Sequence, residues 1–320
     1  MKIVSADDID REFTFIGLVE TLREAFRQGA VQPVRHHHRV EYATGAETTL
    51  LLMPAWSDFR RKSTRSGYIG VKIVTVAPEN NAIGKPAVMG QYLLLDGETG
   101  EPLALIDGQR LTQWRTACAS ALAATYLARK DASRLLVVGA GALSVFLAQA
   151  HAAVRPITRI SIWNRTFANA AKVAEELNRL GLNAQAVTDL EEETAAADVI
   201  SAATISRAPL IKGALLRPGA HVDLVGAFTP DMRESDDAAI QRSTVFVDTR
   251  QGAAAEAGDI VQPLSSGLLK PEDIAADLYD LARDAHQGRR DDDEITLFKS
   301  VGAAIEDLAA AAAIYERMAV

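Results

Sequence analysis

The sequence predicts an α/β fold, in which a Rossmann-type, doubly wound parallel sheet is joined to an α+β domain. An apolar run at residues 134–138 stops on Gly139-x-Gly141 and passes directly into a helical pattern at 142–154. A second apolar run at 159–163 completes a β-α-β unit, and strands and helices continue to alternate after it, as they do in doubly wound sheets. The chain has 320 residues, which is long for a single hydrophobic core, so we expect two domains.

Composition and charge limit the possible functions. The hydrophobic share of 48% and charged share of 24% are ordinary for a globular protein. A net charge of −8 argues against nucleic acid or an anionic membrane as a partner. Cys118 is the single cysteine, and the first residues lack an apolar signal core, so we expect a cytoplasmic protein. Residues 135–154 approach the length of a membrane span, but glycines and polar residues interrupt them.

The first third of the chain reads as one helix followed by a mainly antiparallel sheet. Apolar residues at helical spacing predict a helix at 16–29. Segments rich in β-forming residues predict strands at 48–53, 68–76, 88–95 and 102–106. The Asp-Gly-Glu-Thr-Gly run at 96–100 is a strong hairpin turn between the last two strands. A long helix at 111–130 then links this region to the dinucleotide domain.

The second half continues the alternation of helices and strands. Predicted helices cover 167–180 and 190–197, and predicted strands cover 184–187, 198–203, 220–225 and 244–248. An alanine-rich final helix at 300–318 could return to the first domain. We therefore predict a substrate-binding and dimerisation domain of residues 1–115 with 300–320, and a Rossmann domain of residues 116–299.

The glycine turn is the predicted seat of a pyrophosphate. Gly139 would allow the tight turn, Gly141 would let the backbone approach the phosphates, and Ser144 takes the third position of the fingerprint. A helix amino terminus next to such a turn attracts phosphate. The predicted contacts are Gly139, Ala140, Gly141, Ala142 and Leu143.

The end of the second strand bears on the choice of cofactor. NAD-selective sites usually have an acidic residue there, which accepts hydrogen bonds from the ribose hydroxyls. This chain has Asn164-Arg165-Thr166 instead. The Arg165 guanidinium and Thr166 hydroxyl can bind a 2′-phosphate, so we expect NADPH to be preferred and NADH to be possible. The alternative is that Arg165 is a solvated loop cation.

Six separated motifs, in order along nearly the whole chain, resemble the ornithine cyclodeaminase and mu-crystallin family. They are Gly70-Val-Lys-Ile-Val74, Asp107-Gly108 with the segment 111–121, Val137-Val-Gly-Ala-Gly-Ala142, Ile162-Trp-Asn-Arg-Thr166, Gly258-Asp259, and Phe298-Lys-Ser-Val-Gly302 with Glu306-Asp307. The resemblance implies a dimeric two-domain enzyme whose cofactor lies between a Rossmann domain and an N-terminal domain. It also implies reactions of amino acids and the corresponding imines.

Two positions favour one branch of the family. The ornithine cyclodeaminases that the chain resembles carry acidic residues where this chain has Leu51 and Phe228. A buried ammonium without acceptors costs roughly several kcal/mol, so a free diamine fits poorly. The segment 225–234 is similar to the family's 1-pyrroline-2-carboxylate reductases, which make L-proline with NAD(P)H. We therefore expect an oxidoreductase acting on a CH–NH group. Met53 and Phe228 should line its substrate pocket. A further possible substrate is 1-piperideine-2-carboxylate, which would be reduced to L-pipecolate.

By resemblance, Lys72 and Arg115 are the catalytic residues. An arginine can hold a substrate carboxylate through two parallel hydrogen bonds, which fixes distance and orientation. Lys72 could bond the same carboxylate, or donate a proton that turns the imine into an iminium. The alternatives are that Arg115 only pairs with a carboxylate at the domain interface and that Lys72 is a surface residue of an edge strand.

A second cation is expected from the segment 33–39. Either Arg35 or Arg39 could match the family's arginine, and we favour Arg35. The histidines at 36–38 suggest a metal site, but in an extended strand they alternate faces and no acidic cluster accompanies them. We therefore expect no metal.

The nicotinamide end of the cofactor should meet the carboxyl ends of the strands, where ligands bind in open α/β sheets. The candidates there are Thr204, Val225, Gly226 and Ser300. Thr116 is a further candidate hydroxyl contact.

Other functions remain open at this point. The chain could be an alanine dehydrogenase of the same family, an ornithine cyclodeaminase, or a protein that binds NADPH without turnover, as the crystallin relatives suggest. The presence of Lys72 and Arg115 argues against pure binding, because storage makes no demand on them.

Overall fold

The computed structural model describes residues 1–43, 47–60 and 67–318. The chain divides into two compact units, one made of Met1–Arg115 with Ala304–Val320 and the other of Thr116–Ala303. Residues 300–303 therefore group with the second unit, whereas the sequence analysis assigned the C-terminal segment to the first unit from residue 300 onward. The roles predicted for the two domains remain predictions.

The first unit is built on one sheet. Within the described residues its strand order is β1-β7-β6-β5-β4-β2, and β3 also pairs with β4. All pairs are antiparallel except β1 with β7. The strands are β1 (Lys2–Val4), β2 (Ala30–Val31), β3 (His36–Glu41), β4 (Glu47–Ser57), β5 (Tyr68–Val76), β6 (Val88–Asp96) and β7 (Pro102–Asp107). The four strands expected from 48 to 106 are all present.

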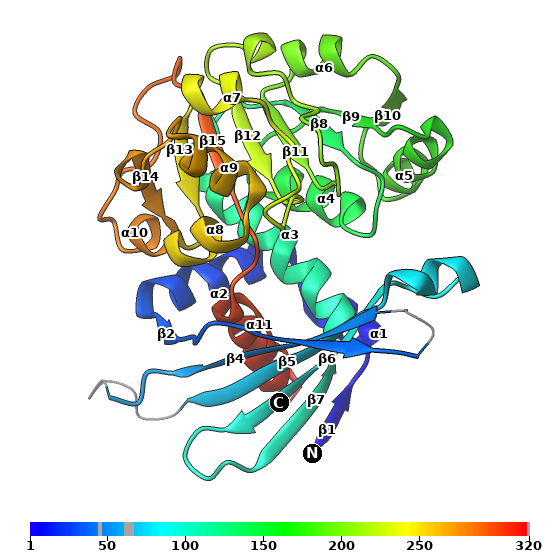
Figure 1. Ribbon diagram of the computed structural model, residues 1–320, viewed down its shortest axis with the longest axis vertical. Helices are drawn as coiled ribbons and strands as arrows, with labels where there is room; N and C mark the ends of the chain where they lie inside the picture. The colour runs from blue at the N-terminus through cyan, green and yellow to red at the C-terminus, as the bar shows by residue number, and fades with distance from the viewer. Residues whose placement is uncertain (44–46, 61–66, 319–320) are drawn as a thin grey trace. The chain divides into compact units, whose positions relative to one another are not determined.

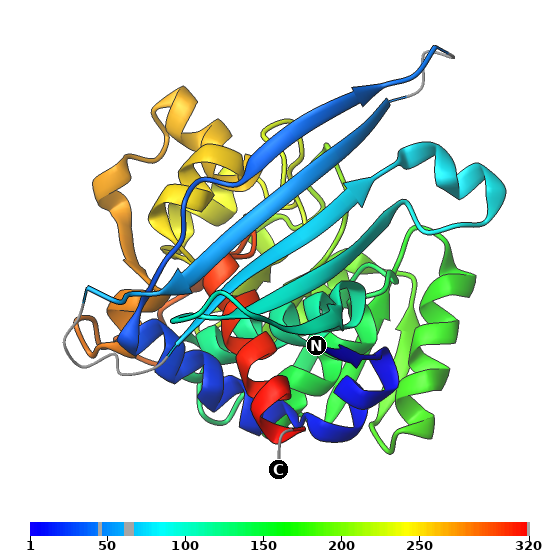
Figure 2. The ribbon, with the colours of Figure 1, turned by 90° about the horizontal axis from the view of Figure 1, so that it is seen from below.

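Helices cover one face of this sheet. Helix α2 (Phe15–Gln28) is amphipathic and buries Leu18, Leu22 and Phe26, as its spacing predicts. Helix α11 (Ala304–Arg317) packs against α2 and against β4, β5 and β6, and Figure 2 shows it in red across these strands. Helix α1 (Ala6–Glu12) lies before α2. The C-terminal helix therefore supplies part of the core of the N-terminal unit.

The second unit is a parallel sheet of the doubly wound type (Figure 1). Within the described residues the order is β10-β9-β8-β11-β12-β15-β13-β14, and every pair is parallel. The strands are β8 (Arg134–Val138), β9 (Arg159–Trp163), β10 (Ala184–Val187), β11 (Val199–Ala202), β12 (His221–Leu224), β13 (Thr244–Val247), β14 (Ile274–Asp277) and β15 (Thr296–Lys299). Strands β8 to β13 were predicted from the sequence, whereas β14 and β15 were not.

Helices cover both faces of the parallel sheet. Leu135 and Val137 of β8 belong to one apolar core, and Leu136 and Val138 belong to the other, because successive side chains of a strand point to opposite faces. The helices of this unit are α4 (Ser144–Val154), α5 (Phe167–Arg179), α6 (Leu190–Ala196), α7 (Asp237–Arg242), α8 (Arg250–Glu256), α9 (Gly258–Ser266) and α10 (Leu278–Ala282). None of the helices in the described residues is long and apolar enough to span a bilayer.

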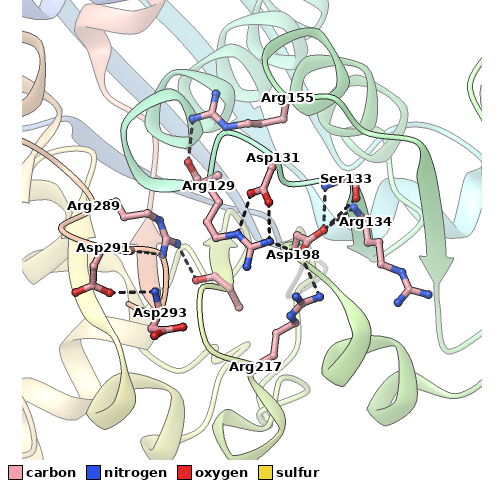
Figure 3. Close-up of polar contacts among 12 residues, drawn as sticks. Arg129, Asp131, Ser133, Arg134, Arg155, Asp198, Arg217, Arg289, Asp291 and Asp293 are labelled. Carbon is pink, nitrogen blue, oxygen red and sulfur yellow. Dashed lines mark hydrogen bonds and ion pairs between the residues drawn. The ribbon is translucent and has the colours of Figure 1, made fainter.

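Helix α3 (Gly108–Leu127) begins three residues before the predicted start and ends three residues before the predicted end. Its carboxyl end is held by arginines, some of which Figure 3 shows. Arg155 donates to the carbonyls of Ala124 at 2.5 Å and Ala128 at 3.0 Å, and Arg289 donates to that of Leu127 at 2.6 Å. These bonds satisfy carbonyl groups that a helix end leaves without partners. A hollow of about 680 Å³ at this place is lined by Arg155 and Arg289 together with other residues of both charges, among them Arg129 and Asp131.

Candidate active site

Lys72 lies in a buried cluster of charged groups within the first unit. It is on β5, next to Val71 and Ile73, which point to the other face of the sheet. Lys72 Nζ lies 2.8 Å from Asp307 Oδ2 of α11, and only 4% of the lysine side chain is exposed. Because β5 is an interior strand and Lys72 is buried, the alternative of a surface lysine on an edge strand is wrong.

Arg115 joins the same cluster from α3. Its Nε donates to Asp307 Oδ1 at 2.9 Å and its Nη1 to Glu306 Oε2 at 2.7 Å. Both carboxylates are fully buried. Arg115 thus pairs with two carboxylates of its own unit. Among the described contacts, Nη2 is the guanidinium nitrogen without a hydrogen bond.

The ionisation of Lys72 follows from this environment. Burial, and then repulsion from Arg115, lowers the pKa of Lys72 to about 8, although Asp307 opposes the change. Burial acts to raise the pKa of Asp307, but Arg115 and Lys72 beside it lower that pKa below its ordinary value. Burial also acts to lower the pKa of Arg115, and the two carboxylates raise it overall. Lys72 is thus the member of the cluster that can release a proton near neutral pH.

The two candidate arginines of the 33–39 segment have different surroundings. Arg35 is half-buried and near enough to Lys72 to lower its pKa. Arg39 Nε is bonded to Glu47 at 2.7 Å and lies 3.2 Å from Glu41, with its side chain largely exposed. Arg35 is therefore the candidate whose charge acts on Lys72.

Three uncharged residues lie on the same face of the sheet as Lys72. Met53 on β4 and Tyr92 on β6 stand directly opposite Lys72, so their side chains share its face. Leu51 is half-buried in β4. Tyr92 was not predicted: it is fully buried, and its hydroxyl has no hydrogen-bond partner in the described residues. Burial, and then Asp307, raises the pKa of Tyr92 well above its usual value.

The candidate cofactor residues of the second unit gather at one edge of its sheet. They follow the carboxyl ends of five neighbouring strands: Asn164 after β9, Gly139 after β8, Thr204 after β11, Val225 and Gly226 after β12, and Ser300 after β15. Backbone bonds tie the strand ends together, such as Val225 N to Ala202 O at 2.7 Å and Ser300 N to Leu224 O at 3.1 Å. The strand order reverses between β8 and β11, and dinucleotides bind at such switch points.

The glycine turn has the geometry of a phosphate seat. Gly139 has a φ of +114°, and a Cβ there would lie 2.7 Å from the carbonyl oxygen of Ala203, so only glycine fits. Gly141 and Ala142 are exposed, Ala140 and Leu143 are half-buried, and Leu143 gives α4 no side-chain cap. Ser144 N, at the start of α4, donates to the Gly141 carbonyl at 3.1 Å, and no side chain caps this helix end.

The remaining candidates have varied positions. Arg165 and Thr166 are exposed just past β9, and Asn164 Nδ2 donates to the Thr166 carbonyl at 3.0 Å. Thr116 is buried in α3, and Phe228 is 46% exposed in the loop after β12. In the part of the chain that the structure describes, no three His, Cys, Asp or Glu side chains form a candidate metal site, and His36 to His38 lie exposed in β3.

Sequence reasoning missed a second buried charged cluster at the same sheet edge. Glu234, Asp259 and Lys299 are each fully buried, and two of them contact the loops of Thr204 and Gly226. Asp259 and Lys299 belong to family-like motifs, but no sequence signal linked either of them to Glu234.

Comparison with known proteins gives consistent results over the whole chain. The model of the ornithine cyclodeaminase/mu-crystallin family matches residues 1–320. The Delta(1)-pyrroline-2-carboxylate reductase of Paracoccus denitrificans is 40% identical over 297 residues, which are 92% of either protein.

Solved structures show the same likeness. The Thermococcus litoralis Delta(1)-pyrroline-2-carboxylate reductase, in complex with NADH and L-proline, matches with a TM-score of 0.91 and 33% identity, covering 100% of this chain and 98% of that one. An archaeal alanine dehydrogenase dimer with bound NAD matches with a TM-score of 0.89 and 29% identity, covering 100% of this chain and 96% of that one.

Proposed function

Since the chain belongs to the ornithine cyclodeaminase/mu-crystallin family, we propose that it reduces 1-pyrroline-2-carboxylate to L-proline with a nicotinamide dinucleotide. The observation that carries this proposal is the match, over essentially the full length of both chains, to a reductase described in complex with NADH and L-proline. The protein is thus an oxidoreductase acting on a CH–NH group.

The buried cluster of the first unit would hold the substrate carboxylate. Arg115 presents Nη2, Lys72 presents Nζ, and Arg35 lies near enough to act on Lys72. Asp307 holds the first two cations close together despite their repulsion. A ring acid would place its single carboxylate against Lys72 and Arg115. A substrate with a second ammonium would instead add positive charge to a site whose carboxylates, Asp307 and Glu306, are already paired.

Lys72 is the proposed proton donor. With a pKa of about 8 it is mostly protonated at neutral pH and still releases its proton readily. Transfer of that proton from Nζ to the imine nitrogen produces an iminium, whose carbon accepts hydride more readily than that of the neutral imine. Asp307 stabilises Lys72 as the ammonium before transfer.

The residues of the second unit fit a dinucleotide. The uncapped amino end of α4 and the Gly139 turn would bind the pyrophosphate, and Thr204, Val225, Gly226 and Ser300 would surround the nicotinamide end. When bound, the reduced nicotinamide supplies the hydride. Thr116 remains a proposed hydroxyl contact.

We also propose a preference for NADPH over NADH. Asn164, Arg165 and Thr166 offer no carboxylate at the end of β9, and Arg165 is exposed beside the Thr166 hydroxyl. A guanidinium and a hydroxyl at this position suit a 2′-phosphate. The neighbouring structures were described with NADH and with NAD, so NADH remains an accepted cofactor in this proposal.

A homodimer is the proposed assembly. Val40, Ile73 and Met89 are each more than a third exposed and, by strand register, lie on the face of the first unit's sheet opposite to that of Lys72. An exposed apolar face of this kind favours pairing with a second copy. The molar mass of the purified protein by light scattering tests this, and a monomer at working concentration would refute it.

The experiment that tests the function is a substrate panel with the purified protein. Oxidation of NADPH and NADH should be fastest with 1-pyrroline-2-carboxylate and slower with 1-piperideine-2-carboxylate or with pyruvate and ammonium. Lys72→Ala should abolish turnover and retain NADPH binding, while Lys212→Ala, which removes an exposed lysine paired with Glu191, should behave as wild type. If both imines are inert and L-ornithine with NAD⁺ yields ammonia, the chain is a cyclodeaminase and the proposal is wrong.

A further inference from the structure

A buried charged cluster lies directly beneath the strand ends of the second unit. It consists of Glu234 in the loop after β12, Asp259 in the first turn of α9, and Lys299 at the end of β15, and each side chain is fully buried. Lys299 Nζ lies 3.5 Å from Asp259 Oδ2 and 3.9 Å from Glu234 Oε2. The proposed reaction assigns no role to any of the three.

Two members of this cluster bond the loops that carry the candidate nicotinamide contacts. Glu234 Oε1 accepts two hydrogen bonds from one residue, from Thr204 N at 2.6 Å and from Thr204 Oγ1 at 2.8 Å. Lys299 Nζ donates to the carbonyl oxygen of Gly226. The ends of β11 and β12 are therefore held by side chains and not only by the sheet.

Asp259 in turn holds the segment that carries Glu234. Its Oδ1 accepts from Glu234 N at 3.0 Å, from Ser235 N at 2.9 Å and from Ser235 Oγ at 3.1 Å. This fixes the backbone on either side of the Glu234 carbonyl, so the glutamate side chain reaches Thr204 from a defined position. The network then runs without interruption from α9 to the end of β11.

The loops held in this way are tightly packed. A Cβ on Gly226 would lie 2.0 Å from the Thr204 carbonyl oxygen and 2.5 Å from Glu234 Oε1. Ala227 follows with a left-handed φ of +48°, and its carbonyl accepts from Gly258 N at 3.2 Å. A non-glycine residue in that region is strained, and strain persists only where the surroundings hold it.

Stability alone gives a poor reason for such a cluster. Apolar residues of similar size are often as stable as a buried ion pair or more so, because charged groups lose their hydration on burial. What the charged groups add is direction, since each bond fixes a particular atom of the Thr204 or Gly226 loop. The directed bonds come from Glu234 Oε1 and Asp259 Oδ1, whereas Glu234 Oε2 and Asp259 Oδ2 have no hydrogen bond in the described residues and lie 3.9 Å and 3.5 Å from Lys299 Nζ.

We propose that Glu234, supported by Asp259 and Lys299, is a positioning residue that fixes the Thr204 and Gly226 loops in the shape that binds the nicotinamide end of the cofactor. The inference rests on the proposed function in one respect, that these loops meet the nicotinamide.

The cluster also has an electrostatic consequence. With Glu234 protonated, Asp259 and Lys299 balance each other, and loss of that proton leaves one negative charge below the loops.

Varying the pH changes the protonation state of Glu234. Burial raises the pKa of Glu234 to about 8. Lys299 opposes this rise, and the neighbouring Asp259 adds to it. The oxidised nicotinamide carries a positive charge and the reduced ring does not. As the pH rises through about 8, affinity for NAD⁺ should increase relative to affinity for NADH, and Glu234→Gln should remove that change.

The decisive test compares two ligands that differ only at the nicotinamide end. Dissociation constants of NADH and of ADP-ribose, which lacks the nicotinamide, are measured for wild type, Glu234→Ala and Glu234→Gln. Glu234→Ala should weaken NADH by about tenfold or more, because both Thr204 bonds are lost, and should change ADP-ribose by less than about twofold. Glu234→Gln keeps an oxygen that accepts from Thr204 and should remain within about threefold of wild type for NADH. Glu191→Gln, an exposed carboxylate of the same unit, is the matched control.

Equal losses for NADH and ADP-ribose in Glu234→Ala would mean a merely structural role and would overturn the proposal, as would unchanged NADH affinity. If Glu234→Ala fails to fold, Thr204→Val removes one of the same bonds from the other side, and it should weaken NADH and not ADP-ribose. Because these are binding measurements, they need no imine turnover. A wild type that binds NADH selectively at the nicotinamide end but reduces no imine would refute the proposed function and leave this inference standing.

Discussion

Replacing Asp307 by Asn tests how the buried cluster controls the proton of Lys72. The carboxylate lies 2.8 Å from Lys72 Nζ and stabilises the ammonium against burial and against Arg115. Losing one opposite charge at such a distance lowers the pKa of a lysine by about 1 to 3 pH units. From a wild-type pKa of about 8 for Lys72, a decrease of about two pH units takes the protonated fraction at pH 7.5 from roughly three-quarters to roughly one-thirtieth. The expected loss in kcat at that pH is therefore about 25-fold.

The assay is the pH profile of imine reduction. Because the protonated form of Lys72 is the active one, kcat should be high at low pH and fall as the pH rises through about 8 in the wild type. In Asp307→Asn the same fall should occur about two pH units lower, so that activity recovers in acid. Glu306→Gln is the matched control: it removes the neighbouring buried carboxylate, which bonds Arg115, and should raise KM with little movement of the profile. A folded Asp307→Asn protein with an unmoved profile would refute Lys72 as the proton donor.

Three further predictions concern other parts of the molecule. Arg165→Ala should raise the Kd for NADPH by about 10-fold or more and leave that for NADH within about twofold; equal effects on both would remove Arg165 from 2′-phosphate binding. Arg35→Ala should raise KM for the imine by about tenfold, roughly 1.4 kcal/mol, while Arg39→Ala, whose guanidinium pairs with surface carboxylates, stays near wild type; the reverse order would exchange their roles. Burial lowers the pKa of His221 to about 3, so the unfolded chain gains a proton below pH 6.5 that the folded chain does not. Urea denaturation should therefore show stability falling by up to about 1.4 kcal/mol per pH unit below that pH, a contribution that His221→Asn should lack.

The elements with a strong local pattern were predictable from the sequence. Strands β4 to β7 are rich in β-forming residues, and a recognisable hairpin turn joins β6 to β7. Strand β8 leads into a glycine turn whose chemistry is visible in the sequence. Both β14 and β15 have four residues, but so do β10 to β13, so length does not explain why these two strands were not predicted. Nothing local shows that β15 lies between β12 and β13, since its place is set by the crossover connections.

The candidate site was predictable one residue at a time but not as a set of contacts. Lys72 and Arg115 could be named from motifs, but their shared partner Asp307 lies on the last helix, 192 positions beyond Arg115. The hydrogen bonds that Arg115 makes within the protein could not be predicted: Nε donates to Asp307 and Nη1 to Glu306, which leaves one N–H of Nη1 and both of Nη2. Glu234 illustrates the same limit, since only the fold brings it to Thr204.

Transfer of deuterium from labelled cofactor is the most direct test of the central claim. NADPH or NADH carrying deuterium at the transferring position of nicotinamide C4 is incubated with the protein and 1-pyrroline-2-carboxylate, and the product is analysed by mass spectrometry and NMR. The account predicts L-proline with one deuterium at the α-carbon. Unlabelled proline, or no proline while the cofactor remains reduced, would contradict it.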